Sequence, residues 1–409
     1  MFKRESYIKK VEAFIEKPII KIFSGIRRSG KSTLMKLLIE HLKTNKSIPP
    51  ENILYINKES MSFSFIKTSE DLHHYVINYF KGKAGSFFLF IDEVQMIEHW
   101  QMAVNSFLSD QIADIYISGS NSVLLSSELA TLLSGRYIEI PVYTLTFDEF
   151  CYFSGDKDKK LLFKQFLKYG GFPGIHQMEM QDEIVYQYIS AIFDSILLKD
   201  IVLRNGIRNV NLLEKIVYFV FDNIGNVFSA KKVVHFLKKE FRSVSMETIY
   251  NYLRYLEQPF ILYKAKRYDL KGKKYLETNE KYFLADIGIR HAVLGFREGD
   301  ISALLENIVF LELKKRGYRV YIGMLDNQEI DFIIEKENAK AYIQVAYLLE
   351  SEKTVEREFG VLLKIRDNYP KYVLSMDEYW GQDFHGIQRL NIMDFLLNET
   401  LPLTAVNLA

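Results

Sequence analysis

The stretch that most constrains the fold of this chain is residues 19–38, where an apolar run, a loop with two glycines and a helical pattern follow one another. The apolar run consists of Ile19, Ile20, Ile22 and Phe23. It has the composition of a buried parallel strand. Residues 25–32 read GIRRSGKS and match G-x-x-x-x-G-K-[ST] at each fixed position. The sequence therefore predicts a strand, a tight loop and a helix in that order.

The loop has the chemistry of a nucleotide phosphate site. Gly25 and Gly30 allow the backbone to curl so that successive N–H groups point inward, and the N-terminus of the following helix attracts the same anion. Lys31 would reach the β- and γ-phosphates, and Ser32 would supply a hydroxyl to Mg²⁺. The predicted nucleotide-binding residues are Gly25, Ile26, Arg27, Arg28, Ser29, Gly30, Lys31, Ser32 and Thr33. The alternative is a glycine-rich turn that contains a lysine by chance.

A second apolar run, within residues 87–95, ends in the carboxylates Asp92 and Glu93. Beside a phosphate loop, Asp92 can hold Mg²⁺ directly or through water, and Glu93 can polarise the water that attacks the γ-phosphate. Without that loop upstream, a buried strand ending in a solvated acidic turn would be the simpler interpretation. The loop favours the catalytic one.

Two further polar positions follow along the same alternation of strands and helices. Residues 114–121 predict a strand that ends at Ser120 and Asn121, and residues 122–133 predict a helix. Asn121 is placed either to sense the γ-phosphate or to cap that helix. Arg136 precedes the strand expected at 137–142 and could reach the nucleotide of a neighbouring subunit, or pair with a surface carboxylate.

The chain resembles the AAA-type branch of the P-loop ATPases in four motifs and in their order, which are GIRRSGKS, FFLFIDE, SGSN and SGR. The resemblance implies a five-stranded parallel sheet with helices on both faces, ATP and Mg²⁺ as cofactors, and often a ring or other oligomer. It implies Mg²⁺ ligands at Ser32 and Asp92. It also implies the catalytic residues Lys31, Glu93, Asn121 and Arg136, with Arg136 matching the arginine finger by position.

The chain also resembles a bacterial and archaeal family of ATP-binding proteins in which a GGFPG segment, here residues 170–174, follows SGRY. That family pairs an AAA-type domain with an uncharacterised C-terminal domain. We therefore expect an α/β protein with four parts. These are an ATPase core at 1–145, a helical lid or connector at 146–208, a winged helix at 209–290, and an α/β nuclease-like domain at 291–409.

Composition sets broad limits on the class of protein. A length of 409 residues predicts two to three domains, and 48% apolar residues suffice for buried cores. The single cysteine, Cys151, excludes a framework of intrachain disulfides. The N-terminus lacks the apolar segment of a signal peptide, and no window approaches the ~18 apolar residues of a membrane span. We expect a cytoplasmic protein without membrane contact.

Residues 209–257 predict three helices, and a strand pair turning at residues 271–273 follows them. Three helices followed by a hairpin are the elements of a winged helix in their usual order. Ser245 would cap the N-terminus of the third helix. On that helix the spacing predicts that Met246, Ile249 and Leu253 face inward.

The same region is basic. Residues 229–274 hold twelve Lys or Arg against four Asp or Glu, a net charge of +8. The remainder must carry −7 to give the total of +1. This predicts contact with double-stranded DNA or another nucleic acid, although a positive hairpin that contacts an acidic protein is an alternative.

The last part of the chain resembles the PD-(D/E)xK nuclease fold. The resemblance rests on Glu306 in a helix, Asp331 in a strand, and the QVA triplet at 344–346 in the next strand. Gln344 replaces the expected acid and Ala346 the expected lysine, so metal binding and water activation should both fail. We expect an inactive nuclease-like scaffold. Lys340 could substitute as the lysine, but nothing in its spacing supports that.

These patterns predict a Mg²⁺-dependent ATPase whose nucleotide state controls the basic winged-helix module, with a nucleic acid as partner. The main alternative is an ATP-driven protein-interaction or signalling switch that does not bind DNA. A small-molecule kinase is disfavoured because Asp92 and Glu93 suit water activation. A metal-dependent nuclease is the remaining candidate.

Overall fold

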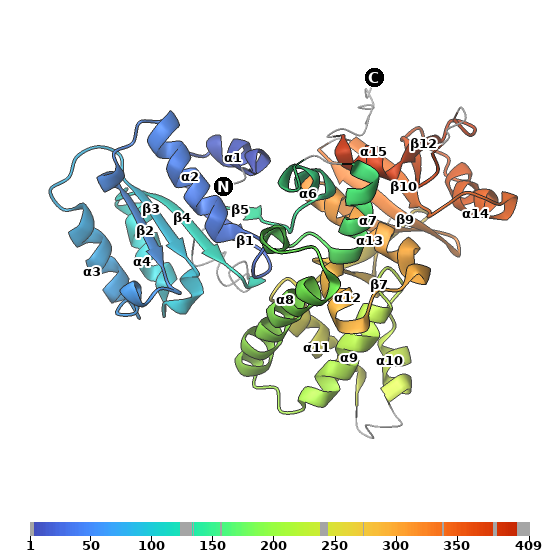
Figure 1. Ribbon diagram of the computed structural model, residues 1–409, viewed down its shortest axis with the longest axis horizontal. Coiled ribbons are helices and arrows are strands. Elements are labelled where there is room, and N and C mark those ends of the chain that lie inside the picture. The colour runs from blue at the N-terminus through green and yellow to red at the C-terminus, as the bar shows by residue number, and fades with distance from the viewer. Residues whose placement is uncertain are drawn as a thin grey trace. The chain divides into compact units, whose positions relative to one another are not determined.

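The computed structural model describes residues 4–122, 133, 135–155, 158–237, 244–272, 274–337, 339–378 and 383–398. The chain forms two compact units (Figure 1). Unit 1 comprises Met1–Thr144 and Gln258–Phe260, and unit 2 comprises Leu145–Glu257 and Ile261–Ala409. The helix expected at 122–133 lies almost entirely outside the described residues. Within the described ranges, no helix is both long and apolar enough to cross a membrane.

Unit 1 contains a parallel sheet, to which five strands contribute among the described residues. Its order is β2-β3-β4-β1-β5, and each neighbouring pair is parallel. The strands are β1 (Ile20–Ser24), β2 (Ile53–Asn57), β3 (Phe88–Asp92), β4 (Asp114–Gly119) and β5 (Tyr137–Pro141). The helices are α1 (Glu5–Glu12), α2 (Lys31–Asn45), α3 (Ser69–Phe80) and α4 (Trp100–Ser109). The 3₁₀ helices are η1 (Pro50–Asn52), η2 (Met61–Phe63) and η3 (Val94–Met96). The predicted parallel sheet is confirmed.

The unit 1 sheet is covered by helices on both faces, which explains its continuous apolar strands. Successive residues of β1 enter opposite cores: Ile22 packs with residues of α3 and α4, and Phe23 packs with residues of α1 and α2. On the α2 face, the rings of Phe90 and Tyr116 stack with their centroids 4.4 Å apart. The sheet therefore holds the loops that follow its strands at one well-defined edge.

Unit 2 begins with helices and ends with a mixed sheet, to which seven strands contribute in the described part. Its helices are α6 (Phe147–Phe153), α7 (Lys159–Tyr169), α8 (Asp182–Ser195), α9 (Val210–Asp222), α10 (Ala230–Leu237), α11 (Met246–Glu257), α12 (Ile287–Leu294), α13 (Ile301–Lys315), α14 (Glu352–Leu363) and α15 (Ile392–Leu397). Its 3₁₀ helices are η5 (Pro173–Gln177) and η7 (Glu298–Asp300), and η6 (Ile196–Leu203) is a π-helix. Its strands are β6 (Leu262–Asp269), β7 (Lys274–Leu284), β8 (Arg319–Leu325), β9 (Gln328–Lys336), β10 (Ala339–Val345), β11 (Lys371–Ser375) and β12 (Gln388–Asn391).

The β6–β7 hairpin, expected as the wing of a separate module, is continuous with the C-terminal sheet. The sheet order is β12-β11-β10-β9-β8-β6-β7, and β6 pairs in parallel with β8 at Arg267 opposite Ile322. The expected division at residues 290 and 291 therefore separates strands that share one sheet.

Helix α11 begins largely as expected. The Ser245 hydroxyl accepts a hydrogen bond from the backbone N–H of Thr248 at 3.1 Å, which confirms the predicted cap. Ile249 and Leu253 are buried, but Met246 is 53% exposed. Its predicted inward position is wrong because it is the first residue of the helix.

Candidate functional site

The phosphate loop joins β1 to α2 and requires glycine at its first position. Gly25 has a φ of +146°, and a Cβ atom placed there would lie 2.2 Å from the carbonyl oxygen of Val142. Gly30 ends the loop at a φ of +100°, and Arg28 between them also adopts a positive φ. The loop is therefore tightly curled and packed against the chain that leaves β5.

Lys31, the first residue of α2, lies over this curled backbone. Its ammonium donates hydrogen bonds to the carbonyl oxygens of Gly25 at 2.8 Å and Ile26 at 3.0 Å. The Ser29 hydroxyl is buried, and no described residue forms a hydrogen bond with it. Ser32 and Thr33 are exposed in the first turn of α2, whose N-terminus directs its positive end at the loop.

Asp92 ends β3 and is held by two hydroxyl groups. Its Oδ2 atom accepts a hydrogen bond from the Tyr55 hydroxyl of β2 at 2.8 Å, and its Oδ1 atom accepts one from the Ser118 hydroxyl of β4. Burial, and then the charge of Asp92, raise the pKa of Tyr55 well above its ordinary value, so this hydroxyl remains a donor. Sequence reasoning missed Tyr55 and Ser118, although polar residues near the ends of apolar strands were a usable signal.

Glu93 directly follows the strand and is 7% exposed. Its φ of +56° is unusual for a residue with a side chain and marks a constrained position. The backbone N–H of Glu93 donates to the Ser118 hydroxyl at 3.1 Å, and its carboxylate accepts from the Ser120 hydroxyl at 3.1 Å and from the Gln95 amide. The carboxylate is thus fixed by residues that follow both β3 and β4.

The sheet topology brings most of the predicted site residues to one edge. Strand β4 lies between β1 and β3, and all three are parallel, so the segments after their carboxyl ends are neighbours. The phosphate loop follows β1, Asp92 and Glu93 end β3, and Asn121 follows β4. Asn121 is 1% exposed, so its amide is buried at this edge.

Arg136 lies at the opposite edge of the same sheet. It immediately precedes β5, and its carbonyl oxygen accepts a hydrogen bond from the N–H of Ile20, the first residue of β1. The phosphate loop begins only after the far end of β1. Arg136 is exposed and is therefore separated from the phosphate loop of its own chain by the length of the strand.

The residues at the carboxyl edge fit a phosphate chain with Mg²⁺. The loop supplies an ammonium and a buried hydroxyl, and each Asp92 oxygen that accepts one hydrogen bond retains capacity for a water or a cation. Among the described residues, no group of three or more His, Cys, Asp or Glu side chains is arranged to hold a metal ion. Mg²⁺ here would therefore depend on Asp92, Ser32 and the phosphates themselves, as this cation commonly does in proteins.

A second polar cluster lies in unit 2 and includes both acids predicted from the nuclease resemblance. The ammonium of Lys281 on β7 forms ion pairs at 2.7 Å with Glu306 of α13 and with Glu329 of β9, and lies 4.0 Å from Asp331 of β9. The Lys281 side chain is 3% exposed. Sequence reasoning missed Lys281 and Glu329, because Lys281 follows a run of polar residues in β7 and nothing in that run indicated its burial.

Protonation in this cluster is strongly perturbed. Burial raises the pKa of Glu306 to about 8 and that of Asp331 to about 6, although the Lys281 ammonium acts in the opposite direction. Burial lowers the pKa of Lys281, but the carboxylates more than offset this and raise it above its ordinary value. The lysine is therefore charged and bound by acids, so it is poorly suited to activate a water.

The other residues considered in the nuclease resemblance are Gln344, Ala346 and Lys340. Gln344 accepts a hydrogen bond from the N–H of Asp331 at 2.7 Å and donates one to Glu358 of α14 at 3.0 Å. Ala346 is buried. Lys340 does not join the cluster, because its ammonium lies among aromatic rings, 5.2 Å from the ring centroid of Tyr268.

The basic region at 229–274 is partly exposed. Its exposed basic residues in the described ranges are Lys231, Lys232, Arg254, Lys264, Lys266 and Lys271. Arg267 is 8% exposed because alternate residues of β6 face the interior. Lys271 forms an ion pair with Asp326 at 2.5 Å. The side chains of Lys238, Lys239, Arg242, Lys273 and Lys274 lie outside the description.

Two family models match parts of this chain. Residues 17–151 match the family model of an AAA domain, and residues 160–300 match that of a domain of unknown function, DUF8612. The structure of the ORC2 protein of Aeropyrum pernix, solved with ADPNP and ADP, covers 75% of this chain and 92% of its own at 11% identity. The TM-score of this similarity is 0.40.

Two relatives are similar over most of the chain. An uncharacterized protein of Haemophilus influenzae is 40% identical over 402 residues, which cover 97% of this chain and 99% of the relative. The protein MJ1544 of Methanocaldococcus jannaschii is 32% identical over 360 residues, which cover 83% of this chain and 77% of that protein. The chain therefore belongs to the family that includes these two proteins, and it carries an AAA domain at residues 17–151.

Proposed function

We propose that this protein binds ATP with Mg²⁺ and hydrolyses it. The observation that carries the proposal is that Glu93 and Asp92 lie at the same edge of the sheet as the phosphate loop, held by hydroxyl groups of residues in or directly after neighbouring strands. A buried, oriented carboxylate at this edge suits water activation. The alternative use of the loop in a kinase would need an acceptor site, and no described feature supports one.

Each residue at the edge has a distinct role in the proposed reaction. Lys31 exchanges its bonds with the loop carbonyls for bonds with the β- and γ-phosphates. Asp92 and Ser32 hold Mg²⁺, which neutralises charge on the phosphates. Glu93 accepts a proton from the attacking water, and Asn121 is positioned to contact the γ-phosphate. Ser118 and Tyr55 keep Asp92 in place.

Arg136 completes the site of a second copy of the chain in this proposal. Its exposed position at the opposite edge of the sheet prevents it from reaching its own nucleotide but suits a head-to-tail assembly. An arginine supplied in this way stabilises charge that develops on the transferred phosphoryl group.

Mixing two inactive variants tests this assignment. Arg136→Ala keeps the phosphate loop, and Lys31→Ala keeps the arginine, so a mixture of the two should regain ATP hydrolysis that neither shows alone. Normal hydrolysis by Arg136→Ala, or a mixture as inactive as its parts, would contradict the role in a second copy.

We further propose that unit 2 contacts a nucleic acid through the exposed lysines of α10 and β6. These side chains are Lys231, Lys232, Lys264 and Lys266. Exposed cations on one region favour a phosphate backbone as partner. A second candidate is a protein-interaction switch, favoured by the exposed apolar side chains of Phe236 and Tyr250 on α10 and α11, which suit a protein surface better than a phosphate backbone.

We also propose that the nuclease-like region does not cut nucleic acids. Lys281 is held by Glu306 and Glu329. Gln344 supplies an amide where active members of the resembled fold carry an acid. Incubation of plasmid DNA with Mg²⁺ or Mn²⁺ should leave the DNA intact, whereas cleavage that is lost in Asp331→Ala would overturn this assignment.

The first experiment is steady-state ATP hydrolysis with and without double-stranded DNA, at low and moderate salt. Lys31→Ala is the control and should lose nucleotide binding, because the triphosphate loses its fixed counter-charge. Stimulation by DNA that fades with salt would support the nucleic-acid role, since phosphate contacts release counterions. Hydrolysis that is indifferent to DNA would favour the protein-interaction switch, and absence of ATP binding by the wild type would overturn the proposed function.

A further inference from the structure

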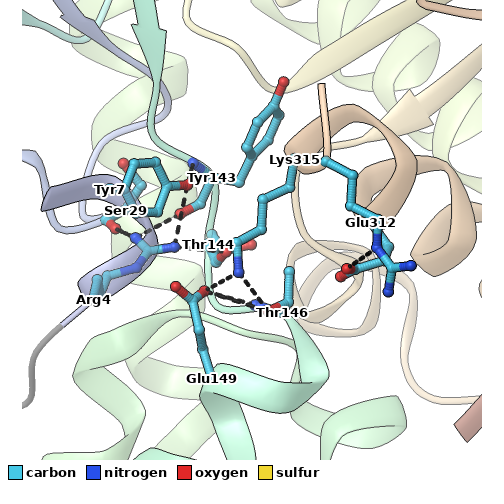
Figure 2. Close-up of polar contacts among 10 residues, drawn as sticks. Arg4, Tyr7, Ser29, Tyr143, Thr144, Thr146, Glu149, Glu312 and Lys315 are labelled. Carbon is cyan, nitrogen blue, oxygen red and sulfur yellow. Dashed lines mark hydrogen bonds and ion pairs between the residues drawn. The ribbon is translucent and has the colours of Figure 1, made fainter. Parts of the chain in front are cut away.

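Arg4, which directly precedes α1, contacts the backbone of the phosphate loop. Its guanidinium donates to the carbonyl oxygens of Ser29 at 3.0 Å and Tyr143 at 2.9 Å (Figure 2). It also approaches the carbonyl oxygen of Thr144 at 3.5 Å and lies over the ring of Tyr7, 4.5 Å from its centroid. Arg4 is 5% exposed, so these contacts are made away from bulk water.

The contact with Ser29 determines how one peptide group of the loop is oriented. The carbonyl of Ser29 and the N–H of Gly30 belong to the same planar peptide, and no cis peptide bonds occur in the described chain. When the carbonyl is directed to Arg4, the N–H of Gly30 must therefore point the opposite way. A charged donor on the carbonyl also polarises that N–H and makes it a better donor to an anion.

The contact with Tyr143 ties the same guanidinium to the segment 142–146, in which the chain passes from unit 1 to unit 2. Val142 already packs its carbonyl against Gly25, at a distance that leaves no room for a Cβ atom. The first part of the segment is thus fixed to both ends of the phosphate loop, through Gly25 and through Ser29.

The second part of the segment is fixed within unit 2. The N–H of Leu145 donates to the carbonyl oxygen of Gly171 at 2.7 Å. Lys315 of α13 donates to the Thr146 hydroxyl at 2.8 Å and forms an ion pair with Glu149 at 3.1 Å (Figure 2). The residues on either side of the unit boundary are therefore each held by a charged side chain, Arg4 before it and Lys315 after it.

We propose that Arg4 is a positioning residue that orients the phosphate loop and couples its nucleotide state to the segment 142–146, and that Lys315 passes this coupling to α13. The proposal rests on the proposed function as an ATP-binding protein. Phosphate binding draws the Gly30 N–H toward the anion, which strengthens the bond between the Ser29 carbonyl and Arg4. The same guanidinium then holds Tyr143 and Thr144 more firmly, so ATP makes the segment less mobile.

Two measurements on the full chain test the coupling. The first is the affinity for a fluorescent ATP analogue with Mg²⁺, and the second is hydrogen exchange of the amides in 143–150 with and without ATP. Arg4→Met should weaken nucleotide binding on the order of tenfold, the change expected from about 1.4 kcal/mol. At saturating ATP it should also lose the ATP-dependent protection of 143–150. Arg4→Lys should restore part of both, because one ammonium can serve one of the two carbonyls.

Control variants separate coupling from general damage. Lys9→Met removes an exposed charge from α1, the helix that directly follows Arg4, and should change neither measurement. Lys315→Met does not touch the phosphate loop, so it should keep wild-type ATP affinity while losing the protection of 145–149. Thermal unfolding without nucleotide identifies any variant that does not fold.

The outcomes distinguish this inference from the proposed function. Nucleotide-dependent protection in Arg4→Met or in Lys315→Met that equals the wild type would overturn the coupling alone, as would an unchanged ATP affinity in Arg4→Met. A wild-type protein that binds no ATP would overturn the proposed function, and this inference with it.

Discussion

At the scale of single residues, the candidate site depends on hydroxyl groups that hold carboxylates. Ser118 donates to Asp92 and accepts from the N–H of Glu93, so one side chain positions both acids. Tyr55 holds the other oxygen of Asp92. The left-handed backbone at Glu93 costs conformational free energy. The conformation persists because the surrounding contacts stabilise it.

Glu93→Gln should keep ATP bound while slowing its hydrolysis roughly 10²–10⁴-fold, because the amide cannot accept the proton of the attacking water. Single-turnover hydrolysis, measured beside equilibrium binding of ATP, separates the two effects. Glu98→Gln changes an exposed carboxylate five residues further along the chain, so it is the matched control and should behave as the wild type. A normal rate in Glu93→Gln would show that the catalytic base lies elsewhere.

At the scale of elements, β1 delivers the phosphate loop but contains a fully buried charge. The Lys21 ammonium bonds to Asp114 at the start of β4 and to the carbonyl oxygen of Lys17 at 3.2 Å. Asp114 also accepts bonds from the Tyr116 hydroxyl at 2.7 Å and the N–H of Glu16 at 2.8 Å. Burial lowers the pKa of Lys21 and raises that of Asp114, so each partner depends on the other to remain charged.

Lys21→Met should lower the free energy of unfolding of unit 1 by about 3–5 kcal/mol, because it leaves the Asp114 carboxylate buried without its cation. Urea unfolding, monitored by hydrogen exchange of individual peptides, measures the free energy of unfolding of unit 1 separately from that of unit 2. Lys36→Met, on the exposed side of α2, should change the same quantity by less than about 0.5 kcal/mol. Equal effects of the two variants would mean that the ion pair does not stabilise β1.

At the scale of the whole molecule, the Lys281 cluster connects three elements of unit 2: β7, α13 and β9. In it, one buried ammonium lies among several carboxyl groups. The carboxyls of Glu306 and Asp331 bind protons more tightly when folded than when unfolded, because burial raises both pKa values. The stability that Glu306 contributes is therefore fully present below its unfolded pKa of 4.5 and is lost as the pH rises through about 8.

Glu306→Gln should consequently make unit 2 less sensitive to pH. Between pH 6 and pH 9 the thermal midpoint of unit 2 should fall more in the wild type than in the variant, since only the wild type must ionise this carboxyl. Asp331, whose pKa is raised to about 6, contributes a similar loss at lower pH in both proteins. Glu298→Gln, an exposed change nearby in sequence, should follow the wild type. Parallel pH profiles for all three proteins would contradict the assignment.

Local patterns in the sequence were sufficient for the strand, the phosphate loop and the helix at residues 19–38, and for the parallel sheet around them. Glycine positions, apolar runs and terminal carboxylates act through short-range sterics and burial, which neighbouring residues determine. The sequence also predicts that Asp92, Glu93 and Asn121 lie at one edge of the sheet, because the carboxyl ends of parallel strands meet there.

Tertiary structure alone decided which distant side chains meet. Tyr55 reaches Asp92 across 37 residues, and Arg4 reaches Tyr143 across 139. Lys281 lies in the acidic cluster. The sequence had indicated only that Ala346 stands where a lysine was expected. The hairpin of β6 and β7 joined the C-terminal sheet in place of standing apart. Such pairings depend on how whole elements pack, and the burial of large surfaces selects that packing without leaving a signature in any short stretch of sequence.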